Sequence, residues 1–329
     1  MDARVSLALR GRRSASVAAD VLAAELGLAP RQVVAAVEDL GRYGFVIESH
    51  PIEGFRLVAA PERLFDAEVV SGLGVSRVGR RVRCLGTVSS TNDLAWQAAE
   101  QGPDETDGLA ILAEYQTAGR GRRGNRWVAP PHTSVLCSVV LWVPQVPRQG
   151  GVLTRAAALA VAEAIEQQCR LSVGIRWPND LVVDDRKIAG ILVEARPASD
   201  GGGPVVVGAG INCSQPEEAF PADIRPHVAS LAMLGEDVDR TLLARGLLVA
   251  LDRAVEQMAD DRGIGDLARR AAARCRTLGR RITVSDGQAT FSGEVLDLDP
   301  DYELVLRLAE GGIRHFPAMT THVLSRGST

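Results

Sequence analysis

Lysine is almost absent from this 329-residue chain. The sequence holds 37 lysine and arginine residues, and Lys187 is the only lysine, so the other 36 are arginine. Arginine keeps its charge and presents a wide planar fork, whereas lysine is a compact point charge on a flexible stem. A single lysine among so many arginines indicates a site where the guanidinium would not fit. The alternative is codon bias with one accidental lysine, and the position by itself does not separate the two interpretations.

Other absences narrow the class of protein. The five cysteines are scattered and form no C-x-x-C pair, which excludes a readable disulfide framework or zinc knuckle and favours reduced thiols. No run of about 18 apolar residues predicts a membrane span, and the apolar stretch at the N-terminus is too short for a signal peptide. The net charge of −4 gives no global basic field for nucleic acid or membrane. We therefore expect a cytoplasmic globular protein of two or three domains.

The first 62 residues predict two helices and a hairpin, the order of a winged helix-turn-helix. The expected elements are a helix over 17–26 with Ser16 as its N-cap, a helix over 30–41, and strands at 45–47 and 55–58. Residues 63–82 are predicted to be a linker.

The largest predicted unit, residues 83–275, mixes helices and strands. Helices are expected over 90–100, 153–169, 241–258 and 265–274, and strands over 109–114, 135–143, 188–195 and 205–211, with a turn at 199–204. The segment from Ser90 to Asp93 resembles a capping box, and Asp239 is a candidate cap of the helix that follows it. Residues 276–329 alternate short strands (281–284, 289–296, 303–308, 313–316) with turns, a pattern typical of a small antiparallel β-barrel.

A glycine- and arginine-rich segment follows the predicted strand at 109–114. Gly119, Gly121 and Gly124 alternate with arginines. Glycine lets successive backbone N–H groups turn toward an anion, and arginine adds charge suited to phosphate or carboxylate. The pattern predicts a mobile loop that closes on an anionic ligand. A phosphate- or RNA-contacting surface loop without catalysis explains it equally well.

Two further segments carry candidate chemistry. Asn179 and Asp180 fall at a predicted turn, with Lys187 seven residues beyond Asp180 and within reach across a hairpin. The alternatives are a turn that bonds its own backbone and a structural ion pair. Gly208, Gly210 and the residues around them end a predicted strand, where small residues allow close approach by a ligand or simply dense packing.

In this order, the segments resemble those of biotin protein ligases. The matching residues are Ser90-Thr91-Asn92, the loop 119–124, Trp177-Pro178-Asn179-Asp180, Lys187-Ile188-Ala189-Gly190 and Gly208-Ala209-Gly210-Ile211-Asn212. The resemblance covers essentially the whole chain and is closest to the bifunctional ligase/repressor type. It implies an α+β multidomain fold: an N-terminal winged helix-turn-helix, a central mixed-sheet α/β ligase domain of class II synthetase-like form, and a C-terminal SH3-like barrel.

The resemblance also implies a reaction and its residues. The carboxylate of biotin attacks the α-phosphate of ATP, and the resulting biotinyl-adenylate is transferred to a lysine of a biotin carboxyl carrier protein, a subunit of acetyl-CoA carboxylase. Catalytic roles fall to Lys187, Arg122 and Asp180. Biotin would be bound by Ser90, Thr91, Asn92, Gln116, Arg120, Gly121, Arg122, Lys187 and Gly190, and ATP or the adenylate by Gly119, Arg120, Arg122, Trp127, Asn179, Lys187 and Asn212. Magnesium is expected with ATP, its ligands coming mainly from the phosphates, and no protein ligand is predicted.

Two other functions stay open at this point. One is a lipoate ligase or octanoyltransferase, which shares a related fold and a catalytic lysine. The other is a repressor that senses a metabolite without turnover. Operator DNA and a second copy of the chain are candidate partners by resemblance.

The charge of the N-terminal unit bears on whether this unit could bind DNA as a repressor does. Residues 1–60 hold seven arginines (4, 10, 12, 13, 31, 42, 56) and seven acids (2, 20, 25, 38, 39, 48, 53), so their net charge is zero. A cluster of Arg10, Arg12 and Arg13 is the candidate DNA footprint. The alternative is a winged helix that only positions the active-site loop.

Overall fold

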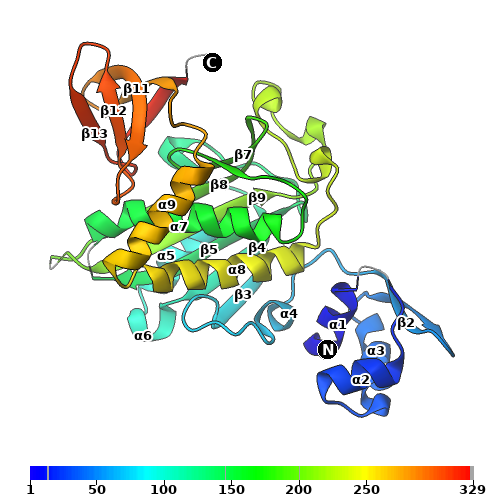
Figure 1. The fold of residues 1–329 in the computed structure, drawn as a ribbon. Coiled ribbons are helices and arrows are strands. Elements are labelled where there is room, and N and C mark those ends of the chain that lie inside the picture. The colour runs from blue at the N-terminus through cyan, green and yellow to red at the C-terminus, as the bar shows by residue number, and fades with distance from the viewer. Residues whose placement is uncertain (13–14, 145, 200, 327–329) are drawn as a thin grey trace.

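The computed structural model describes residues 1–12, 15–144, 146–199 and 201–326 (Figure 1). A helical N-terminal group lies at one end, a large sheet with covering helices forms the centre, and a small sheet lies at the other end. Arg13, part of the predicted basic cluster, and position 200, within the predicted turn at 199–204, lie outside the described residues.

Three helices and a hairpin form the N-terminal group. They are α1 (Ala3–Arg10), α2 (Ala19–Leu26), α3 (Pro30–Gly41), β1 (Val46–His50) and β2 (Gly54–Ala59). The predicted helix pair and hairpin are present, and α1 precedes them unpredicted. Apolar residues from all three helices and from β2 share one core, which includes Leu9, Leu22, Val33, Leu40 and Phe55.

The predicted start of α2 was wrong. Val17 exchanges backbone hydrogen bonds with Phe55 at 2.9 and 2.8 Å, which makes it extended rather than helical. The N-cap is Ala18, which has no side-chain cap hydrogen bond. A long-range strand contact therefore prevails over the local capping preference of Ser16.

The segment expected as a linker is packed into the fold. It contains the short helix α4 (Asp66–Val70), and Leu64, Val69 and Val78 are buried in the core of the central sheet. Glu68 is fully buried and pairs with Arg10 at 2.9 Å, while Arg10 also reaches Asp239 at 2.7 Å. Arg10 thus ties α1 to the central unit, and its guanidinium is not on the surface for the DNA contact that the sequence suggested.

The central sheet has seven strands in the order β3-β4-β5-β9-β8-β7-β6. Their bounds are β3 (Arg81–Val88), β4 (Leu109–Gln116), β5 (Ser134–Val143), β6 (Gly174–Arg176), β7 (Asp180–Val183), β8 (Arg186–Ala195) and β9 (Gly203–Asn212). Only β3 and β4 pair in parallel, and every other neighbouring pair is antiparallel, so the sheet is mixed as predicted.

Helices cover the two faces of this sheet unequally. The helices α7 (Val146–Glu166), α8 (Arg240–Gln257) and α9 (Asp261–Arg274) lie on one face, whereas α5 (Thr91–Ala99) lies on the other, with α6 (Pro103–Thr106) after it (Figure 1). Successive side chains of a strand point to opposite faces. On β4, accordingly, Ala110 and Leu112 join the core under α7 and α8, while Leu109 and Ile111 pack against α5. Among the described residues no helix is both long and apolar enough to cross a membrane.

The C-terminal strands form an open antiparallel sheet, in place of the predicted barrel. The strands β10 (Arg281–Ser285), β11 (Thr290–Leu298), β12 (Leu304–Leu308), β13 (Ile313–Phe316) and β14 (His322–Arg326) are ordered β13-β12-β11-β10-β14. The edge strands β13 and β14 do not pair within the described part of the chain, and β14 was not predicted. Trp177, from the loop after β6, is buried in the core of this sheet and its Nε1 donates to Tyr302 O at 3.1 Å.

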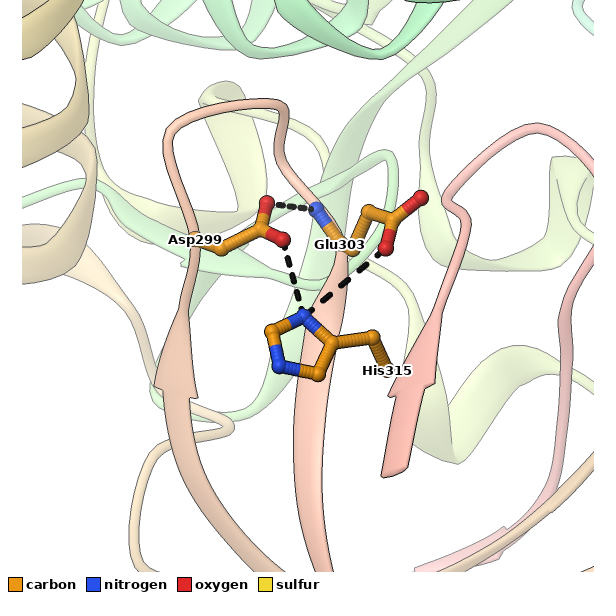
Figure 2. Close-up of side chains that lie close together, drawn as sticks. All are labelled: Asp299, Glu303 and His315. Atoms are coloured by element: carbon orange, nitrogen blue, oxygen red, sulfur yellow. Dashed lines mark hydrogen bonds and ion pairs between the residues drawn. The ribbon is translucent and has the colours of Figure 1, made fainter. Parts of the chain in front are cut away.

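One cluster of ionisable side chains stands out on this sheet. His315 Nδ1 lies 3.0 Å from Asp299 Oδ2 and 3.8 Å from Glu303 Oε2 (Figure 2). Asp299 also accepts the backbone N–H of Glu303 at 2.8 Å. The contacts fasten the β11–β12 turn to β13.

Candidate active site

A cavity of about 320 Å³ opens on the α5 face of the central sheet. Its floor is made of glycines that stand opposite one another on neighbouring strands, with Gly190 of β8 paired to Gly210 of β9 and Gly208 one step along. A Cβ on Gly208 would lie 2.3 Å from Asn92 Oδ1, and one on Gly210 would lie 2.6 Å from the Trp127 ring. The small residues that the sequence singled out therefore let the Asn92 and Trp127 side chains approach the strands at the floor of the cavity.

Twelve of the fourteen predicted site residues line this cavity. They are Ser90, Thr91, Asn92, Gln116, Arg120, Gly121, Arg122, Trp127, Asn179, Asp180, Lys187 and Gly190. The other two, Gly119 and Asn212, do not. Gly119 packs against the backbone of Trp127, where a Cβ would lie 2.4 Å from the carbonyl oxygen. The Asn212 amide is buried outside the cavity, where it donates to Ala229 O and accepts from Gln215.

Lys187 lies on the wall of the cavity beside Asp180, the one carboxylate among the described residues that line it. Its Nζ is 2.6 Å from Asp180 Oδ1, and Arg176 shares the other oxygen of Asp180 at 3.0 Å. The same ammonium is 5.5 Å from the centroid of the Trp127 ring. Since an ammonium has three donors and one is taken by Asp180, Lys187 keeps donors for an anion in the cavity.

The ion pairs with Lys187 and Arg176 also keep Asp180 negatively charged. Burial works to raise the pKa of this carboxyl, but the positive charges of Lys187 and Arg176 hold the pKa below its usual range. A carboxylate with a lowered pKa is a weak proton acceptor. Asp180 is therefore poorly suited to act as a general base, whereas its ion pair with Lys187 suits it to hold that ammonium in place.

The N-terminus of α5 forms the opposite wall through a hydrogen-bond network. The Thr91 backbone N–H donates to Gln116 Oε1 at 2.7 Å, and Ser138 Oγ contacts both Thr91 Oγ1 and Asn92 Oδ1. Ser90 is the N-cap by position, but it makes no capping hydrogen bond. The predicted capping box is therefore wrong, because Gln116 satisfies the helix N-terminus and Asp93 pairs with Arg120 at 2.9 Å instead.

Glu194 holds this wall together and was missed in the sequence. Its carboxylate accepts from Asn92 Nδ2 at 2.9 Å, from Trp96 Nε1 at 3.3 Å and from both terminal nitrogens of Arg120. The signal for finding it was present, since Gly190 and Glu194 are four residues apart on one strand and must share a face.

The Gly-Arg loop reaches across to the C-terminal segment. Arg122 Nη2 donates to the carbonyl oxygens of Ala318, Met319 and Thr321 at 2.7–3.3 Å, and Arg123 Nη2 contacts Thr320 O at 3.5 Å. Burial and the neighbouring charge of Arg123 lower the pKa of Arg122. As a result the cavity is also lined by Thr321, His322 and Val323 from the C-terminal segment.

Comparison with known proteins agrees with the geometry. Residues 85–212 match the model of the Biotin/lipoate A/B protein ligase family. The chain is 34% identical over 241 residues to the biotin--[acetyl-CoA-carboxylase] ligase of Mycobacterium tuberculosis, covering 71% of this chain and 86% of that protein. This chain belongs to the biotin protein ligase family.

Two further similarities extend beyond the matched domain. The bifunctional ligase/repressor BirA of Bacillus subtilis is 29% identical over 87% of both chains. The biotin protein ligase of Aquifex aeolicus, solved with biotin and ATP, superposes with a TM-score of 0.63 at 22% identity, covering 75% of this chain and all of that one. The second similarity shows a shared fold.

The Asp180 ion pairs predict a pH dependence of stability in this biotin protein ligase. Because the folded-state pKa of Asp180 lies below the unfolded-state value of about 3.9, the ion pairs stabilise the fold above that pH and are lost as the pH falls through the folded-state pKa. We expect the difference in unfolding free energy between the natural chain and Asp180→Asn, measured by urea titration, to be largest near neutral pH and to shrink below about pH 4. A difference that stays constant from pH 7 to pH 3 would contradict the assignment.

Proposed function

We propose that this protein is an ATP-dependent ligase that activates biotin as biotinyl-5′-adenylate and transfers it to a lysine of a biotin carboxyl carrier protein. The observation that carries the proposal is the placement of the only lysine, on the wall of a glycine-floored cavity with arginines at its rim. The relatives named as biotin--[acetyl-CoA-carboxylase] ligases and the neighbour solved with biotin and ATP support the choice of substrates.

The chemistry requires two anions to meet. A carboxylate and a phosphate oxygen repel by about 4 kcal/mol for unit charges about 4 Å apart at an effective dielectric near 20. In the proposed step the biotin carboxylate oxygen bonds to the α-phosphorus, the bond to the β-phosphate oxygen breaks, and pyrophosphate leaves with the electron pair. Lys187 screens the approach and follows the charge into the transition state. An ammonium contacts one oxygen of each partner, whereas the broader guanidinium would intrude on the reacting atoms.

The second step transfers the acyl group. The neutral amine of the carrier lysine attacks the acyl carbon, the bond to the AMP oxygen breaks, and AMP leaves while the amine proton passes to solvent. Asp180 orients Lys187 in both steps through the 2.6 Å ion pair.

The remaining cavity residues divide by wall. Ser90, Thr91, Asn92 and Gln116 on the α5 side hold biotin, with Arg120 and Gly121 covering it. Arg122, Asn179 and Trp127 face the nucleotide, and Gly190 allows close approach to the strand. Gly119 acts indirectly, because it packs against the backbone of Trp127 and so positions that residue. Asn212 also acts indirectly, because its hydrogen bond to Ala229 fixes the end of β9.

Magnesium fits this site only as a partner of the nucleotide. Among the described residues, Asp180 is the one carboxylate that lines the cavity, and it is already committed to Lys187 and Arg176. The described cluster with three metal-binding side chains, Asp299, Glu303 and His315, contributes no residue to the cavity. Magnesium would therefore enter on the phosphates of ATP and add charge neutralisation there.

Biotin is favoured over lipoate as the substrate by the names of the relatives. The family model itself covers both types, but the relatives similar over most of this chain are named as biotin ligases. Binding measured by calorimetry with biotin and with lipoate, each in the presence of ATP, separates the two.

Replacing the lysine tests the proposed chemistry. We expect Lys187→Arg to keep the fold, judged by circular dichroism, while biotin- and ATP-dependent labelling of an isolated carrier domain falls by at least about 100-fold, since removing one preorganised charge from a site of this kind costs about that much. Arg186→Lys, one residue earlier on β8 and outside the cavity lining, serves as the matched control and should retain labelling. Normal labelling by Lys187→Arg would defeat the proposal.

A repressor role is a second candidate, favoured by the similarity to BirA over 87% of this chain. We divide the chain into residues 1–62 as a winged helix-turn-helix, 63–82 as a packed connection, 83–275 as the ligase unit and 276–329 as the C-terminal sheet. Dimerisation through the central sheet would give such a repressor two DNA-binding units. Arg31 and Arg42 are exposed at the two ends of α3 and are the cations that this helix offers to phosphate, with Arg42 also 3.6 Å from Asp39.

The repressor role predicts salt-dependent DNA binding through α3. We expect mixed-sequence duplex DNA to bind the full chain in the presence of biotin and ATP, and the double substitution of Arg31 and Arg42 by alanine to lower the slope of log affinity against log salt by about 2, since each phosphate contact contributes about 1. Arg269→Ala, an exposed arginine on α9, is the control. An unchanged slope would leave the N-terminal unit without a DNA-binding role.

A further inference from the structure

The cluster of Asp299, Glu303 and His315 joins three parts of the C-terminal sheet on its solvent side. Asp299 follows β11, Glu303 precedes β12, and His315 lies on β13 (Figure 2). The strand register places His315 opposite Val305, and alternation puts Glu303 on the same face as Val305. Phe316, the next residue on β13, faces the core instead. One imidazole and two carboxylates therefore converge where solvent reaches them, with the His315 side chain 50% exposed.

The distances in this cluster are close to those around a bound metal ion. His315 Nδ1 lies 3.0 Å from Asp299 Oδ2 and 3.8 Å from Glu303 Oε2, and all three ligand atoms lie within 4.8 Å of one another. Ligand atoms placed tetrahedrally about 2.1 Å from a zinc ion are about 3.4 Å apart. Small movements of the three side chains would bring them to that spacing and leave the fourth position to water.

A proton on the imidazole satisfies this cluster less completely than a divalent cation would. A protonated His315 has a single Nδ1–H, and Asp299 at 3.0 Å is within hydrogen-bond distance, whereas Glu303 at 3.8 Å is not. Among the described residues, the Glu303 carboxylate accepts no hydrogen bond, and no arginine lies within ion-pair distance of either carboxylate. A divalent cation contacts both carboxylates and the imidazole lone pair at once.

The β11–β12 turn fixes the position of the first ligand in advance. Asp299 Oδ1 accepts the backbone N–H groups of Asp301 at 3.0 Å and Glu303 at 2.8 Å, which directs Oδ2 to the cluster. Arg155 of α7 anchors the same turn by donating to the carbonyl oxygens of Asp299 and Pro300 at 3.4 and 2.8 Å. Because the turn is already ordered, a metal ion would not have to order it on binding.

We propose that Asp299, Glu303 and His315 form a zinc-binding site that fastens β13 to the β11–β12 turn. A nitrogen ligand combined with two carboxylates favours zinc, whereas magnesium and calcium prefer sites made of oxygen alone. His315 binds the ion through the lone pair of Nδ1 and keeps its proton on Nε2. None of the three residues lines the cavity, so the site stabilises the C-terminal sheet and takes no part in the proposed ligase reaction.

Zinc chloride is the direct probe of this site. Its dissociation constant is measured by calorimetry on the full, reduced chain, with magnesium and calcium chloride titrated for comparison. We expect zinc to bind more tightly than either, and His315→Gln and Glu303→Gln each to weaken zinc binding by at least about 10-fold, since even loss of a residue that supports a metal ligand costs about 10- to 100-fold. Both substitutions remove a ligand while keeping a polar side chain of similar size.

A matched control separates this site from other zinc ligands in the chain. His227→Gln replaces an exposed histidine at the end of η3 (Arg225–His227), outside the cluster, and should bind zinc as the natural chain does. Circular dichroism without zinc checks that each variant keeps the fold.

Hydrogen exchange followed by mass spectrometry locates the bound ion. At a zinc concentration about 100-fold above the dissociation constant, amide exchange that requires opening of the site should slow by up to about 100-fold in residues 299–316. Residues 1–62 should not change, and His315→Gln should show no zinc-dependent slowing.

Three results would each overturn the zinc site. One is zinc affinity that stays the same in His315→Gln and Glu303→Gln. Another is magnesium or calcium binding as tight as that of zinc, and the third is zinc binding that leaves exchange in residues 299–316 unchanged. Loss of ligase activity in Lys187→Arg bears on the proposed function alone, because Lys187 is not part of this cluster.

Discussion

The charge balance of one cavity is the constraint on which the rest of this structure depends. A chain with a net charge of −4 keeps its single lysine and several arginines around a glycine floor, and among its described residues supplies one carboxylate there. Asp180 holds Lys187 at 2.6 Å but is itself shared with Arg176, so the pair stays oriented without cancelling the positive field of the site. In the proposed reaction, this positive charge would offset the repulsion between the two anionic substrates before either of them binds.

The mixed sheet builds this cavity through simple alternation. On β8 and β9 the residues facing α7 are apolar and buried, while those facing α5 include Gly190, Gly208 and Gly210. The glycines leave the space, and Glu194, farther along β8, fixes Asn92 and Arg120 at its edge. The Gly-Arg loop then closes the remaining side by bonding to the carbonyl oxygens of residues 318–321. Three parts of the chain that are distant in sequence thus define one chemical environment.

The family resemblance supplied most of the site residues. Local patterns in the sequence predicted the long helices and several strands, including β4, β5, β8 and β9, because periodicity is a local property, but they did not predict β3, β6, β7 or β14. They failed where a distant partner decides the outcome. Val17 is extended because its backbone pairs with that of Phe55. Asp93 forms an ion pair with Arg120 instead of capping the helix, and Arg10 is buried against Glu68. Thr321 and His322 line the cavity because Arg122 docks onto their segment, a contact between residues almost 200 positions apart that local patterns do not encode.

The central claim is that the Lys187 ammonium allows a carboxylate and a nucleotide phosphate to occupy the cavity together. Calorimetry of biotin binding with and without a non-hydrolysable ATP analogue measures this coupling directly, in the natural chain and in Lys187→Gln, with biotinol as the uncharged counterpart of biotin. The account predicts little antagonism in the natural chain, an antagonism of about 10-fold or more between biotin and the analogue in Lys187→Gln, as loss of more than about 1.4 kcal/mol of screening requires, and none with biotinol. Equal coupling in all three cases would contradict it.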